Sequence, residues 1–205
     1  MKQKESKRAR VGLYSAGLHA YWSQFAGLHD RILGYNSFIG ERVSEWGEVF
    51  NFGLVDSETA AREAGEFFNA HNVDIILAHS GTYFTSSCVL PLHQICKAPT
   101  VMLNLQPAAQ MAYAKTDTGE WLAHCVGCPV PEAANAFERA AIPLSIINGL
   151  LGLSETPKIS MADEVTAHMP QAKRAWNEIE QWVKAAGVKR TMQHARFGFL
   201  GNNYS

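Results

Sequence analysis

The side chains best suited to contact a ligand come at, or shortly after, the ends of short apolar runs. They are His19, Tyr21, His79, Tyr83, Phe84 and Gln106. A histidine can donate to a hydroxyl, move a proton or bind a metal ion, and a glutamine amide both donates and accepts. The aromatic faces suit the C–H face of a sugar, whose hydroxyls the polar groups would meet. These residue types predict a site for a polar small molecule.

Simpler interpretations of the same residues stay open. His19 and His79 can each be a hydrogen-bonded interior histidine, and Trp22 and Phe84 can belong to the core. Gln106 is the better polar candidate because its amide offers a donor and an acceptor in one group.

Several catalytic patterns are absent from the sequence. The first turn lacks the Gly-x-Gly-x-x-Gly of dinucleotide sites, and no P-loop motif is present. Ser15 and Ser80 would need a base and an orienting group, and no such spacing can be identified. Most Glu and Asp residues fall on the polar faces of expected helices, so no carboxylate pair is expected at the ligand-binding edge. We therefore expect neither catalytic residues nor metal ligands within this chain.

The four cysteines include one Cys-x-x-Cys pair, Cys125 and Cys128, preceded by His124. A structural zinc site needs four ligands, and no second pair exists. Pro129 and Pro131 follow the pair, which favours a loop that enters a helix over a thioredoxin-like arrangement. A redox or metal-binding protein built on this segment remains a third, weaker hypothesis.

The elements that must position these residues are read from hydrophobic periodicity. Runs of β-branched and apolar residues predict strands, and amphipathic spacing predicts helices between them. Expected strands cover 11–14, 49–55, 73–78, 100–105 and 144–147, with helical spacing over 22–32 after the first strand and helices near 57–68, 85–97, 131–141 and from 172 onward. This alternation predicts an α/β fold with a flavodoxin-like parallel sheet sandwiched by helices in three layers. Ligands of such sheets bind at the carboxyl ends of the strands.

The domain organisation is expected to be one α/β domain over 1–194. Residues 195–205 are interpreted as the first strand and turn of a second, truncated α/β domain, because a glycine turn comes just before the sequence stops.

Composition limits the class of protein. Of 205 residues, 47% are hydrophobic and 18% charged, which is typical of a globular chain. A net charge of −1 argues against a nucleic-acid partner. No apolar run reaches the roughly 20 residues of a membrane span, and the first residues lack the apolar part of a secretory signal. We expect a cytoplasmic protein with no membrane partner.

Three segments resemble the N-terminal region of the L-fucose/L-arabinose isomerase family. They are 15–21 (Ser-Ala-Gly-Leu-His-Ala-Tyr), 102–106 (Met-Leu-Asn-Leu-Gln) and 196–201 (Arg-Phe-Gly-Phe-Leu-Gly). The resemblance follows the same order along nearly the whole chain, from residue 11 to 201. Leu18 differs from the Gln of the arabinose enzymes, which puts arabinose specificity in doubt.

The resemblance implies a part of a metal-dependent aldose–ketose isomerase of carbohydrate metabolism. In that family Mn²⁺ is held by glutamates and histidines of later domains, beyond Ser205, so no bound metal is expected here. It implies a homo-oligomer in which His19, Tyr21 and Gln106 contact the sugar of a neighbouring protomer, while Tyr83 and Phe84 line the wall. The chain alone would enclose substrate and be inactive. The alternative hypothesis is a non-catalytic module that binds a sugar or another small ligand.

Overall fold

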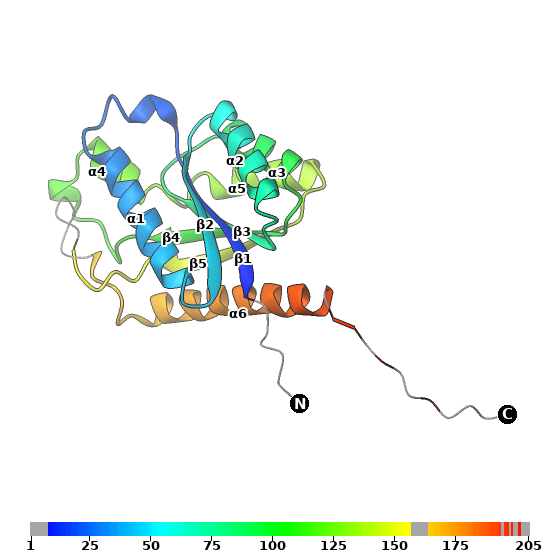
Figure 1. Ribbon diagram of the computed structural model, residues 1–205. Coiled ribbons are helices and arrows are strands. Elements are labelled where there is room, and N and C mark those ends of the chain that lie inside the picture. Colours follow the sequence, from blue (N-terminus) through cyan, green and yellow to red (C-terminus); the bar gives the residue numbers. More distant parts are fainter. Residues whose placement is uncertain (1–7, 157–163, 194, 197, 199–200, 202–205) are drawn as a thin grey trace.

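Five parallel strands form the centre of the protein. The computed structural model describes residues 8–156, 164–193, 195–196, 198 and 201, and the sheet order is β2-β1-β3-β4-β5 (Figure 1). The strands are β1 (Ala9–Ala16), β2 (Gly47–Val55), β3 (Ile75–Ser80), β4 (Thr100–Gln106) and β5 (Leu144–Leu150). This order and the helical layers confirm the expected flavodoxin-like α/β fold.

Helices cover both faces of the sheet in three layers (Figure 1). One core lies between the sheet and α1 (Leu28–Val43) and α6 (Pro170–Gln193). The other core lies between the sheet and the three helices of the opposite face, α2 (Glu58–Ala70), α3 (Ser86–Ile95) and α5 (Val130–Arg139). The remaining helices are α4 (Thr118–His124) and two 3-10 turns, η1 (His19–Tyr21) and η2 (Tyr113–Lys115).

The central strands are apolar on both faces because each face packs against helices. Every residue of β3 is buried, as are seven of the eight residues of β1. A strand buried on both sides requires a nearly continuous apolar run rather than alternation. This explains why 73–78 and 100–105 could be identified as strands from the sequence.

Two helices follow directly from local sequence signals. Ser57 begins α2 by accepting a hydrogen bond from the backbone N–H of Ala60 at 3.3 Å. In α6, Trp176, Ile179 and Val183 recur at helical spacing and are buried against the sheet. The sequence predicted both helices.

The structure departs from the expected elements at two places. The helix after β1 begins only at Leu28, because η1 and a turn at Gly27, whose φ is +80°, come first. The short helix α4 was not expected. It begins at Asp117, whose carboxylate accepts from the backbone N–H of Glu120 at 2.8 Å.

Two earlier expectations are only partly covered by the structure. Within the described ranges, no helix is both long and apolar enough to cross a membrane. The strand expected at 195–201 falls largely outside the described residues, so the second, truncated domain stays a prediction.

Candidate functional site

His19 and Tyr21 of the predicted site lie in η1, at the carboxyl end of β1. The imidazole of His19 is exposed, and its Nδ1 lies 3.2 Å from Oδ2 of Asp56, which follows β2. Trp22 donates from Nε1 to the same carboxylate oxygen at 2.6 Å. Asp56 thus ties η1 to the end of the neighbouring strand, while Ser57 caps the following helix.

Tyr21, Tyr83 and Gln106 lie beside the turn 125–129, between α4 and α5. Burial, and then the nearby Tyr83 and Cys125, raise the pKa of the Tyr21 hydroxyl. A Cβ added to Gly127 would lie 3.5 Å from Nε2 of Gln106, the last residue of β4. The structure therefore places these three residues at the predicted edge. Their role in binding a substrate stays a prediction.

His79 and Phe84 are interior residues, as the simpler interpretation allowed. His79 is 1% exposed and Phe84 is fully buried among the apolar side chains of the core under α2, α3 and α5. Burial lowers the pKa of His79 to about 3, so its imidazole is neutral at ordinary pH. Phe84 therefore presents no surface that could line an open wall.

His79 belongs to a chain of hydrogen bonds that runs from the interior to the exposed Asn51. Its Nδ1 lies 2.7 Å from Oγ of Ser15, which also accepts from Nδ2 of Asn36 at 3.0 Å. Asn51 of β2 donates in turn to Oδ1 of Asn36 at 2.6 Å. Ser15 has no exposed surface, and no carboxylate among the described residues hydrogen-bonds His79. This serine is therefore enclosed and unsuited to attack a substrate.

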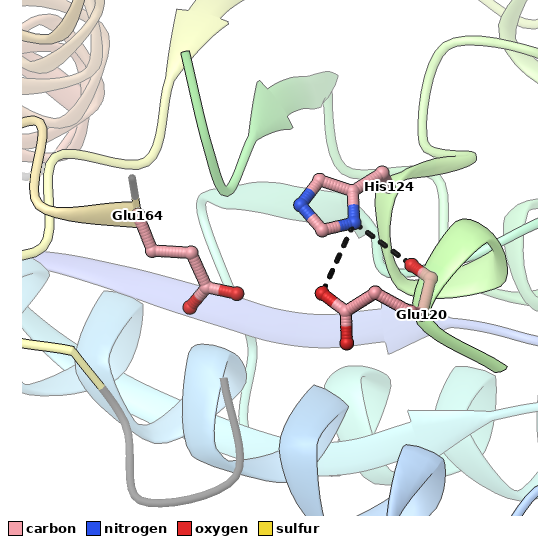
Figure 2. A group of neighbouring side chains, drawn as sticks. All are labelled: Glu120, His124 and Glu164. Carbon is pink, nitrogen blue, oxygen red and sulfur yellow. Dashed lines mark hydrogen bonds and ion pairs between the residues drawn. The ribbon is translucent and has the colours of Figure 1, made fainter. Parts of the chain in front are cut away.

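A second polar group, which the sequence analysis did not predict, lies between α1 and α4. Glu120 and His124 project from α4, one turn apart, and Glu164 joins them from the segment before α6 (Figure 2). Glu164 is held in place because Val165 pairs with Leu153 in a short parallel bridge. Each of the three can offer one ligand atom so that all three atoms lie within 4.8 Å of one another.

Arg31 of α1 binds one oxygen of each glutamate. It donates to Oε2 of Glu120 at 2.6 Å and to Oε1 of Glu164, and its Nε donates to the hydroxyl of Tyr35 at 2.7 Å. The guanidinium is 4% exposed and the Glu164 side chain is fully buried. The other oxygens, Oε1 of Glu120 and Oε2 of Glu164, are buried without a hydrogen-bond partner, and Nδ1 of His124 lies 3.7 Å from Oε1 of Glu120 (Figure 2).

The tautomer of His124 follows from its one hydrogen bond. Nδ1 lies 2.8 Å from the backbone oxygen of Glu120, which can only accept, so Nδ1 carries the proton. In the neutral ring Nε2 then holds a free lone pair, and this atom is buried without a partner. Metal-binding histidines usually donate their other ring N–H to a carbonyl or carboxylate in this way.

The formal charges of this group balance only when His124 is protonated. Two carboxylates and one guanidinium sum to −1 when His124 is neutral, and the group is almost entirely buried. An uncompensated buried charge is costly. A cation bound by the three free atoms would offset it and occupy their unused lone pairs.

A cavity of about 490 Å³ opens beside this group, next to the beginnings of α1 and α4. Arg31 and Glu120 line it together with Phe25, Gly27 and Asp117. Its volume lies within the range of small-molecule sites, and it gives solvent and solutes access to Glu120.

A local signal for half of this site was present in the sequence. Asp117-x-x-Glu120 is a helix-start pattern, and Glu120 and His124 stand four residues apart, on one face of the helix it begins. Arg31 and Glu164 have no such signal, because they are 89 and 44 residues from Glu120 in the sequence and meet it only in the fold.

Comparisons with known proteins do not support the isomerase family. No protein-family model and no curated protein matches the sequence. A solved structure described as a carbohydrate acetylesterase family member from Sinorhizobium meliloti matches with 13% identity and a TM-score of 0.43, covering 86% of this chain and 99% of its own. A second, whose description names no protein, has 12% identity and a TM-score of 0.42 with the same coverage of both chains.

These findings contradict the resemblance to the L-fucose/L-arabinose isomerase family, and the aldose–ketose isomerase function is wrong with it. The alternative of a sugar-binding module gains no clear support either. Two of the motifs that suggested the family, 15–21 and 102–106, are short strand ends followed or completed by polar residues, which the βα geometry itself favours. At 12–13% identity these neighbours assign no activity to this chain.

Proposed function

We propose that this chain binds a divalent metal ion through Glu120, His124 and Glu164. One observation carries the proposal: three buried lone-pair atoms, Oε1 of Glu120, Oε2 of Glu164 and Nε2 of His124, have no hydrogen-bond partner, and their residues lie close together. Buried polar atoms are nearly always paired, so three orphans in one group point to a ligand that accepts lone pairs.

The donor set favours a first-row transition cation. Two carboxylate oxygens and one imidazole nitrogen suit Zn²⁺ or Mn²⁺, with one or more positions left for water. Donor atoms around such an ion stand about 3.4 Å apart when the bonds are about 2.1 Å long. One donor atom from each residue lies within 4.8 Å of the others, so rotation of the side chains would have to bring the three donors closer together to bind one ion.

Arg31 is the positioning residue of the proposed site. Arg31 binds Oε2 of Glu120 and Oε1 of Glu164, which leaves Oε1 of Glu120 and Oε2 of Glu164 available to a metal ion. Partners of this kind fix the direction of metal ligands. The cavity lined by Arg31 and Glu120 supplies a route by which the ion and a small ligand could enter.

This proposal departs from the expectation that the chain holds no metal ligand. That expectation depended on the glutamates lying on solvated helix faces, whereas Glu164 is buried and Glu120 nearly so. The sugar partner, the homo-oligomer and the cytoplasmic location stay predictions that nothing in the structure tests.

Metal binding to the chelator-treated protein tests the proposal directly. Isothermal titration should show one equivalent of Zn²⁺ bound, with Mn²⁺ weaker and Mg²⁺ weakest. Glu164→Gln and His124→Gln should each weaken Zn²⁺ binding at least about tenfold. The matched controls are Glu138→Gln and His168→Gln, which change exposed residues and should bind as the wild type does.

Two results would contradict the proposal. One is a folded, chelator-treated protein that takes up no stoichiometric Zn²⁺ or Mn²⁺. The other is unchanged binding in both site variants, which would move the ion elsewhere. Should Glu164→Gln fail to fold, the visible absorption of Co²⁺ bound to the wild type and to His124→Gln decides the question, because loss of a nitrogen ligand changes that spectrum.

A further inference from the structure

We propose that Cys125 and Cys128 are a redox-active pair that forms a reversible disulfide within the turn between α4 and α5. The pair stands outside the metal-binding group, and nothing in the proposed function uses it.

The two cysteines lie near the two ends of a short turn. Cys125 follows the last residue of α4 and Cys128 lies two residues before α5. Burial, and then the neighbouring Cys128, raises the pKa of the Cys125 thiol, so the two side chains lie close together. A disulfide needs its two Cβ atoms close together, and the turn places the two cysteines only three residues apart.

Hydrogen bonds from the sheet edge hold this turn. Oγ of Ser80, at the end of β3, donates to the carbonyl of Val126 at 2.5 Å. Oγ1 of Thr82 donates to the carbonyl of Leu122 at 2.7 Å. These two hydrogen bonds hold the backbone on both sides of Cys125, so the turn keeps the two thiols together.

The two cysteines differ in solvent exposure, so they take different roles in the reaction. Cys128 is exposed, whereas Cys125 is 4% exposed. A dissolved disulfide can therefore reach only Cys128. Cys88 and Cys96 are both buried and serve as an internal comparison within the same chain.

The chemistry is a thiol–disulfide exchange in two steps with a low-molecular-weight disulfide such as oxidised glutathione. The Cys128 thiolate attacks one sulfur of that disulfide, which forms a mixed disulfide and releases one thiol. Cys125 then attacks the Cys128 sulfur, releases the second thiol and closes the Cys125–Cys128 bond. Two electrons pass from the two cysteines to the added disulfide, and their two protons end on the two released thiols.

The test is differential alkylation and intact mass spectrometry of the wild-type chain after equilibration with oxidised glutathione. The titratable thiols should fall from four to two, with a mass lower by two hydrogens and a peptide linking Cys125 to Cys128. Reduced glutathione in excess should restore all four. Cys128→Ser should stop the loss, and Cys88→Ser should still lose two thiols.

Three outcomes would overturn the inference: four thiols that persist in excess oxidised glutathione, a disulfide that links other cysteines, or a mixed disulfide on Cys128 that never closes. Since the readout is a covalent bond, it does not depend on whether the protein binds a metal ion. Should Cys128→Ser fold poorly, Cys128→Ala or prior alkylation of the exposed thiol gives the same comparison.

Discussion

Acid should unfold this protein through two buried histidines. Besides His79, His93 of α3 is 1% exposed; its Nε2 lies 3.0 Å from the hydroxyl of Tyr14 and its Nδ1 lies 3.0 Å from Oγ1 of Thr100. Burial, with a smaller contribution from Lys97, lowers the pKa of His93 to about 3. Both imidazoles are therefore neutral in the folded state over most of the acidic range.

The direction of the pH effect follows from linkage. A histidine in the unfolded chain has a pKa near 6.5. Below that pH, His79 and His93 therefore bind protons in the unfolded state that they do not bind in the folded state. The unfolded state is thereby favoured, and stability present above pH 6.5 is lost as the pH falls towards 3. At pH 5 each buried histidine should cost about 2 kcal/mol, or about 4 kcal/mol for the pair.

The perturbation is His93→Gln, which removes the proton-binding group and keeps a polar side chain. Between pH 6 and 4, the free energy of unfolding of the wild type should fall more steeply than that of the variant, by about 1.4 kcal/mol per pH unit. Urea unfolding at several pH values, followed by tryptophan fluorescence in a chelating buffer, measures both slopes. Other titrating groups are common to both proteins and cancel in the difference.

The matched control is His168→Gln, because His168 is exposed. Its slope should equal that of the wild type. If His93→Gln shows the wild-type slope as well, the argument that burial suppresses the protonation of His93 is refuted, whatever the absolute stability of the variant.

Three further predictions concern metal, glycines and a helix cap. Zn²⁺ at one hundred times its Kd should raise the free energy of unfolding by about 2.7 kcal/mol and the Tm by about 5–11 °C, and calorimetry should show a smaller rise for Glu164→Gln. Gly34→Ala should stabilise the interior of α1 by about 0.5–1 kcal/mol, because an added Cβ meets nothing within 4 Å. Gly149→Ala should destabilise by about 1–3 kcal/mol, because its Cβ would lie 2.6 Å from Cβ of Ala175; urea unfolding that ranks these two glycine variants the other way would contradict both. Ser57→Ala should cost about 1 kcal/mol in the same assay, and no loss would show that the cap on α2 contributes nothing.

The layers of this protein could be predicted because its strands are buried on both faces. Continuous apolar runs such as 73–78 leave little choice of element, and the spacing of Trp176, Ile179 and Val183 specifies the face of α6. The α/β alternation then restricts the topology to a few arrangements. Short helices cannot be predicted in this way, because they contain too few residues to show a period. The helix α4 has only seven residues and few apolar positions.

The candidate metal site could not be predicted as a whole. Its charges come from three separate segments, and the ion pair between Arg31 and Glu164 spans 133 residues of sequence. Periodicity assigns a charged residue to the solvated face of a helix, whereas Arg31 lies inside because two carboxylates meet it there. Phe84 is likewise inside, because an aromatic side chain after a strand can as well complete the core as line the edge of the sheet.

The chain of Asn51, Asn36, Ser15 and His79 constrains how this protein can change over generations. It crosses from β2 through α1 and β1 to β3, and each member satisfies the next. Replacing only Asn36, Ser15 or His79 leaves a buried donor or acceptor of its neighbour without a partner, whereas replacing two of them together with apolar residues can remove both requirements at once. Homologous sequences should therefore change at these positions together. In a variant library, some double substitutions should fold even though each of the two single substitutions prevents folding.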